Sequence, residues 1–138
     1  MNSALNAYKK NQVQTISQEK LVLMLYDGAV KFTLNAIEAL DDKDISRANE
    51  NFIRCQDIIL ELMSGINWET GELAQSFYTI YEYMHHSLMQ ANIKKDKQIA
   101  VEVCGMAREL RDVWSQMLGE AQGTKDYSTQ KRNLSISG

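Results

Sequence analysis

Residues 45–66 read ISRANENFIRCQDIILELMSGI, and the spacing of their apolar side chains predicts the architecture of the chain. Intervals of three and four residues alternate along the series Ile45, Ala48, Phe52, Cys55, Ile59, Leu62 and Ile66. Such spacing places all members on one face of an α-helix, and it is typical of a helix that packs in a bundle. The stretch therefore predicts a helix with one buried face and one solvated face.

Three further segments repeat this spacing. Their series are Leu21, Leu25, Gly28, Phe32 and Ala36; Leu73, Phe77, Ile80, Met84, Leu88 and Ala91; and Ile99, Val103, Met106, Leu110, Val113 and Met117. The chain has 138 residues and no proline, which favours long uninterrupted helices. The breaks between the segments are short, so consecutive helices should be antiparallel. We predict an all-α, up-down-up-down four-helix bundle over 17–120, with an N-terminal segment (1–16) and a flexible polar tail (121–138).

Polar residues in front of each segment predict where the helices begin. Ser17, Asp44, Thr70 and Asp96 can each accept a hydrogen bond from a free backbone N–H in the first turn. Gly28 lies within the buried series of the first helix, which indicates a close approach of a neighbouring helix.

Composition and charge exclude several classes of function. Fifteen basic and 18 acidic residues give a net charge of −3, which argues against binding of nucleic acid or of anionic lipid. The longest apolar run, residues 21–26, is far too short to span a membrane. There is no secretion signal, and two distant cysteines form no disulfide framework. We therefore expect a reduced, cytoplasmic protein without direct membrane insertion.

The residues that could carry chemistry do not form a catalytic set. Glu82 and His85 have the spacing of one half of a di-iron motif, but such a site needs two motifs and two more glutamates. His85 and His86 point about 100° apart on a helix, so they cannot readily share a metal ion. Cys55 lies in the apolar series and is best interpreted as a core residue. We expect no enzyme activity, no metal and no cofactor.

The first helix carries more apolar surface than one buried face requires. A second stripe lies roughly opposite the first, so the apolar arc is about 240° wide. Neighbouring helices can cover part of this surface, and the remainder predicts an exposed groove for an amphipathic segment of a partner. The residues predicted to bind this client are Leu23, Tyr26, Val30, Leu34 and Ile37, with Ile53 and Leu60 of the second helix.

Several short sequences resemble the flagellar secretion chaperones of the FliS family over roughly residues 5–118. They are Ala7-Tyr8, NQVQT at 11–15, KLVLMLYDGA at 20–29, ANIKKD at 91–96 and LRDVW at 110–114. The order and spacing of these sequences are more specific than any one of them. Gln18 stands where the family usually has a proline, a position that only pre-organises the first helical turn.

The resemblance implies a specific function. Members of this family bind the disordered C-terminal segment of flagellin in apolar grooves, prevent its premature polymerisation in the cytoplasm and deliver it to a membrane protein of the flagellar export gate. Leu5 and Tyr8 match the family positions that dock on the export gate, and the N-terminal segment can cover the empty groove. Two alternatives stay open: an adaptor for a different amphipathic helical client, and a homodimer formed when the groove is empty.

Overall fold

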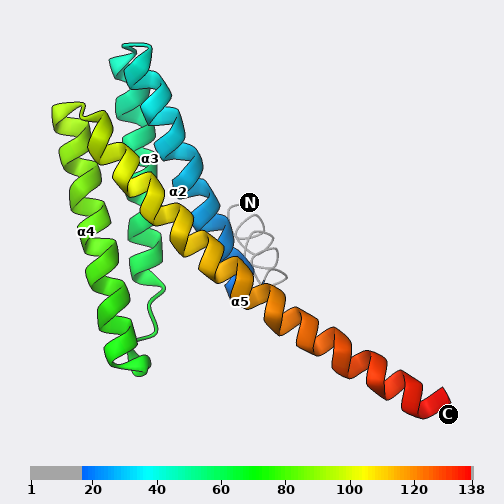
Figure 1. The fold of residues 1–138 in the computed structure, drawn as a ribbon. Helices are drawn as coiled ribbons and strands as arrows, with labels where there is room; N and C mark the ends of the chain where they lie inside the picture. Colours follow the sequence, from blue (N-terminus) through cyan, green and yellow to red (C-terminus); the bar gives the residue numbers. More distant parts are fainter. Residues whose placement is uncertain (1–16, 138) are drawn as a thin grey trace, which may run out of the picture.

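Four α-helices form a closed ring in the computed structural model, which describes residues 17–137 and the side chains of 17–119. They are α2 (Gln18–Asp41), α3 (Ile45–Ser64), α4 (Glu72–Lys94) and α5 (Lys97–Ser137), and a short 3₁₀ helix, η1 (Trp68–Thr70), precedes α4. Each helix contacts the next one along the chain, and α2 also contacts α5. The predicted four-helix bundle is therefore confirmed (Figure 1).

Helix starts agree with the sequence at three of the four predicted positions. Ser17, Asp44 and Asp96 each accept a hydrogen bond from the backbone N–H three residues later. The prediction for Thr70 is wrong, because Thr70 belongs to η1 and α4 begins only after Gly71. Gly71 has a φ of +65°, which glycine adopts without strain, so the chain changes direction one residue later than predicted.

The buried face of α2 differs from the predicted one. Its buried residues are Tyr26, Ala29, Val30, Thr33, Ala36 and Ala39. Of the predicted series only Ala36 is buried, and its other members are half-buried: Leu21, Leu25, Gly28 and Phe32. The reason is that α2 packs between α3 and α5, so the fully buried face is the one directed between these two neighbours. Ala29 and Ala36 are small enough to let both neighbours approach closely.

Gly28 lies at a close contact between α2 and α3, as the sequence predicts. A Cβ atom built on Gly28 would lie 2.8 Å from Cδ1 of Ile58, whereas one built on Gly105 in α5 would meet nothing within 4 Å. Alanine is favoured over glycine in a helix by up to about 1 kcal/mol. Gly105→Ala is therefore expected to raise the free energy of unfolding by about 0.5–1 kcal/mol.

Gly28→Ala is expected to stabilise less than Gly105→Ala, because the Ile58 side chain must move to admit the new methyl group. Urea unfolding followed by circular dichroism measures both values. Equal stabilisation of the two variants would contradict the close approach at Gly28.

Helix α5 diverges from α4 along its length and continues past the bundle (Figure 1). Near the α4–α5 turn, Tyr83 donates a hydrogen bond to Glu102 at 2.6 Å. Further along, Trp114 Nε1 donates to the Glu19 carbonyl oxygen at 2.8 Å, which holds α5 against α2 instead. An opening therefore forms between α4 and α5 towards the end of the bundle where α2 begins. Residues 121–137, predicted as a tail, continue α5 as a helix.

Candidate functional site

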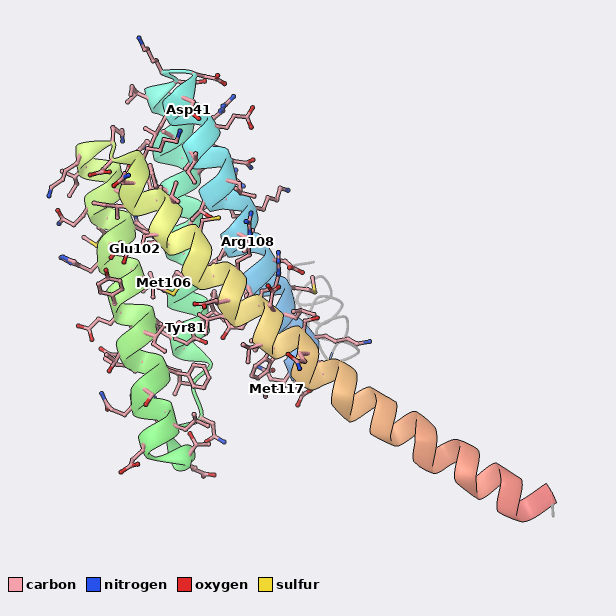
Figure 2. The ribbon with its side chains drawn as sticks, viewed as in Figure 1. Asp41, Tyr81, Glu102, Met106, Arg108 and Met117 are labelled. Atoms are coloured by element: carbon pink, nitrogen blue, oxygen red, sulfur yellow. The ribbon has the colours of Figure 1, made fainter. Side chains whose placement is uncertain are left out.

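An apolar cleft occupies the opening between α4 and α5. It has a volume of about 480 Å³, and we call it the helix-pair cleft. Figure 2 labels Met106 and Met117 on the α5 side and Tyr81 on α4. The cleft is lined by Tyr26, Leu73, Phe77, Ile80, Met106, Glu109, Leu110, Val113, Trp114 and Met117. Almost all of this wall is hydrocarbon, so it suits an apolar ligand surface.

A second cleft of about 350 Å³ adjoins the first at the end of the bundle, and we call it the end cleft. It lies between the start of α2, the end of α3, the connection to α4 and the start of α4. Both clefts share Tyr26, Leu73, Phe77 and Trp114 as lining residues. Together they form one continuous surface, referred to below as the apolar groove.

Aromatic side chains form the inner wall of the apolar groove. Trp114 packs edge-on against Tyr26, with ring centroids 6.4 Å apart. Phe77 stacks on Tyr81 at 5.9 Å. Packed rings of this kind bury large areas and hold defined positions. The groove therefore has a rigid inner wall contributed by α2, α4 and α5.

Large apolar side chains at the rim of the groove are exposed to solvent. Leu73 of α4 and Val113 and Met117 of α5 are each more than half exposed. Single exposed apolar residues are common on protein surfaces, but a contiguous set around a cleft marks an interaction site. These three side chains mark the groove as a candidate interaction site.

The charges around the groove are acidic. Glu19 and Glu61 line the end cleft and Glu109 lines the helix-pair cleft. Within the described residues, no lysine or arginine lines either cleft. The groove therefore favours a segment that is apolar and neutral, or one with basic flanks.

The residues predicted from the sequence to bind the client lie in three different environments. Tyr26 and Val30 are buried core residues, so the expectation that they are exposed on an outer stripe is wrong. The physical reason is the position of α2 between α3 and α5, which covers the stripe to which they belong. Tyr26 nevertheless contributes to the wall of both clefts.

Leu34 lies on the edge of α2 that faces α5. It follows Asp27 and precedes Asp41 by seven residues each, so the three share one face of the helix. Asp27 Oδ1 lies 3.8 Å from Nε of Arg111. Asp41 Oδ1 lies 2.9 Å from Nζ of Lys97, and both of these basic residues belong to α5. Two further members of the predicted set lie towards the same side of α2, three turns before and one turn after Leu34, and are half-buried: Leu23 and Ile37.

Ile53 and Leu60 lie on the edge of α3 that faces α4. They follow Asn49 by four and eleven residues, which places all three on one face. Asn49 accepts a hydrogen bond from Asn92 of α4 at 2.8 Å, which fixes the direction of that face. The α2–α5 and α3–α4 edges lie on opposite sides of the ring, so the predicted residues do not form a single groove. Their role as client contacts stays a prediction.

Leu5 and Tyr8, the predicted docking residues, lie outside the described part of the chain. Sequence reasoning missed the rim of the groove, because Leu73, Val113 and Met117 were placed in buried series. Their spacing is the same whether two helices pack closely or diverge, so periodicity carries no signal for the opening.

The histidine and carboxylate residues considered for metal binding lie on α4. Glu82 is exposed and His85 is half-buried, which agrees with the interpretation of the two as a solvated glutamate and a half-buried histidine. Over residues 17–119, no three histidine, cysteine, aspartate or glutamate side chains come together as metal ligands.

None of the helices within the described residues combines the length and the apolar character needed to span a membrane.

Both cysteines are buried on diagonally opposite helices. Cys55 belongs to α3 and Cys104 to α5, and within the described bundle no Cα atoms of these helices come within 8 Å of each other. A disulfide needs Cα atoms about 4.4–6.8 Å apart, so the two thiols cannot be bridged without moving a helix.

Cys55 is expected to be unreactive while the bundle is folded. Burial raises the pKa of its thiol to about 12, so the reactive thiolate is scarce at pH 8. We expect reaction with a thiol reagent about 100-fold or more slower than in the urea-unfolded chain.

The same shift should lower stability at alkaline pH. Above about pH 9 the unfolded chain releases the Cys55 proton and the folded chain retains it, so the free energy of unfolding should fall as pH rises from 9 towards 12. Cys55→Ala should reduce this fall.

Rapid labelling of Cys55 by the thiol reagent in the folded protein at pH 8 would contradict the burial of this side chain.

Comparison with known proteins identifies the family. The profile of the family described as "Flagellar protein FliS" matches residues 1–121. The flagellar secretion chaperone FliS of Bacillus subtilis is 42% identical over 112 residues, which cover 81% of this chain and 84% of the relative. The protein of the same name from Vibrio cholerae is 31% identical over 122 residues, covering 85% and 90%. That of Salmonella typhimurium is 30% identical over 125 residues, covering 86% and 93%. The chain belongs to the FliS family of flagellar secretion chaperones.

Proposed function

We propose that this protein binds the C-terminal segment of flagellin in the apolar groove, keeps it from polymerising in the cytoplasm and delivers it to the flagellar export gate. The observation that carries this proposal is the groove between α4 and α5 with its exposed rim of Leu73, Val113 and Met117, in a chain of the FliS family.

The groove suits one face of an amphipathic helix. Two diverging helices offer two apolar walls, and a helix places apolar side chains on one side at intervals of three and four residues. Burial of four aliphatic side chains contributes roughly 6–12 kcal/mol before the cost of ordering the client is subtracted. This contribution can exceed the free energy needed to order a segment that is disordered when free, so net binding remains favourable.

A client longer than the groove could continue over the edges of the bundle. Leu34, Ile53 and Leu60 are exposed on those edges and would be its further contacts. Leu5 and Tyr8 would dock the complex on the export gate, in line with the family resemblance. The described part of the chain begins beside the end cleft, which Gln18 and Glu19 line.

Calorimetric titration with the C-terminal segment of flagellin from the same genome tests the proposal. We expect one-to-one binding, a gain of helix in the segment, and a negative heat-capacity change from the burial of apolar surface. A folded bundle that binds no such segment would overturn the proposal. It would favour the second reading, an adaptor for another amphipathic helical client.

A further inference from the structure

Two tyrosines that line the end cleft have their hydroxyls in contact with each other. Tyr26 Oη of α2 and Tyr81 Oη of α4 lie 2.5 Å apart, within hydrogen-bonding distance, and both residues line this cleft. Both residues are buried. Burial raises the pKa of each phenol, so both hydroxyls keep their protons at neutral pH.

The pair has one more donor than it uses. Each hydroxyl carries one proton and two acceptor lone pairs, and the bond between the two consumes one proton. Within the bundle as described, neither hydroxyl has another hydrogen-bond partner. One O–H group therefore remains free to donate, and each oxygen can still accept.

No other side chain of the described bundle accepts a hydrogen bond from either hydroxyl. Leu25, Leu73 and Phe77 line the same cleft with hydrocarbon. Trp114 packs against the Tyr26 ring, and its N–H already donates to the Glu19 carbonyl oxygen. A buried donor without a partner is energetically unfavourable. A ligand that brings an acceptor to this O–H group would therefore bind more tightly.

The charge of the cleft selects the kind of acceptor. Glu19 and Glu61 line it, so a carboxylate on the ligand would be repelled and would also lose its hydration. A lysine has no acceptor to offer the free O–H. A carboxamide is neutral, accepts through its oxygen and donates through its nitrogen, which matches what the two hydroxyls lack.

We propose that the Tyr26–Tyr81 pair is a specificity point of the groove, which selects a client segment carrying an asparagine or glutamine among its apolar residues. This inference rests on the proposed function. Without the tyrosine pair, any apolar helix face could bind the groove; with it, the client must also present a polar side chain at one position.

A double-mutant cycle tests this selection. In the flagellin C-terminal segment, each asparagine is replaced in turn with leucine and each glutamine with methionine, and binding is measured by calorimetry. We expect one of these replacements to weaken binding to the unaltered protein about 10-fold. The same replacement should change binding to Tyr26→Phe/Tyr81→Phe less than about 2-fold, because both hydroxyls are then absent.

Tyr83→Phe is the matched control. Tyr83 also lies on α4 and its hydroxyl donates a hydrogen bond, but to Glu102 and outside both clefts. It should leave the full 10-fold effect in place. Circular dichroism and thermal melting check that each variant is folded. If the double variant is not folded, Tyr26→Phe and Tyr81→Phe are measured separately, and we expect at least one of them to reduce the effect of the amide replacement.

Two results would overturn the specificity point while leaving the proposed function intact. One is a segment that binds but tolerates every amide replacement. The other is a replacement that weakens binding equally with and without the two hydroxyls, which would place the contact elsewhere. A segment that does not bind the folded protein at all would overturn the proposed function, and this inference with it.

Discussion

An aspartate in place of Val113 is expected to weaken binding of the flagellin C-terminal segment about 100-fold or more while the bundle stays folded. Val113 lines the helix-pair cleft and is 58% exposed, so in the free protein the new carboxylate remains hydrated and costs little stability. In the complex an apolar client side chain would cover it, and the charge would lose its water without gaining a partner. Calorimetric titration of both proteins measures the loss.

Val101→Asp provides a closely matched control for this experiment. Val101 lies on the same helix, is 50% exposed and lines neither cleft. The net charge changes by the same amount, so a general electrostatic effect on binding would appear in both variants. We expect Val101→Asp to bind within about 2-fold of the unaltered protein. An equal loss in both variants, or no loss at Val113, would contradict binding in the groove.

Val30→Asp is expected to unfold the bundle or to lower its free energy of unfolding by about 4 kcal/mol or more. Val30 is 5% exposed, on the face of α2 that is covered by its neighbours. The substitution removes roughly 2 kcal/mol of apolar burial and forces a carboxylate into the hydrophobic core. Urea unfolding followed by circular dichroism measures the change.

Leu34→Asp is the comparison, because Leu34 lies one turn further along α2 and is 43% exposed. We expect it to cost less than about 1 kcal/mol. If the two variants were equally stable, Val30 would be a surface residue. That result would support the prediction from the sequence that the whole outer stripe of α2 is exposed. A large difference would confirm that the stripe is divided between core and surface.

Local features of this chain could be predicted from its sequence because they depend on neighbouring residues. Ser17, Asp44 and Asp96 begin helices because their side chains reach backbone N–H groups within the same turn. Gly28 indicates a close helix contact because its missing side chain gives a neighbouring helix room to approach. The number of helices and their antiparallel order followed from spacing and from short connections.

The angle between two helices could not be predicted in the same way. Leu73 and Val113 have the spacing of core residues, and they would be buried if α4 and α5 packed along their full length. They are exposed because α5 diverges from α4, a property of long-range packing that no single segment encodes. For the same reason the outer stripe of α2 could not be divided correctly: whether Tyr26 or Leu34 is covered depends on where α5 crosses.

The unequal fastening of α5 to its two neighbours has a mechanical consequence. Near the α4–α5 turn the helix is bonded to both neighbours, through Lys97 to Asp41 and through Glu102 to Tyr83. Met117 lies twenty residues from Lys97, or about 30 Å along the helix axis. Arg111 and Trp114 hold this part of α5 to α2. A change of about 5° in the angle between α4 and α5 would therefore move the two walls of the groove by about 3 Å relative to each other at Met117, while the contact of α5 with α2 is kept. A groove whose width can change in this way would accept client side chains of unequal bulk.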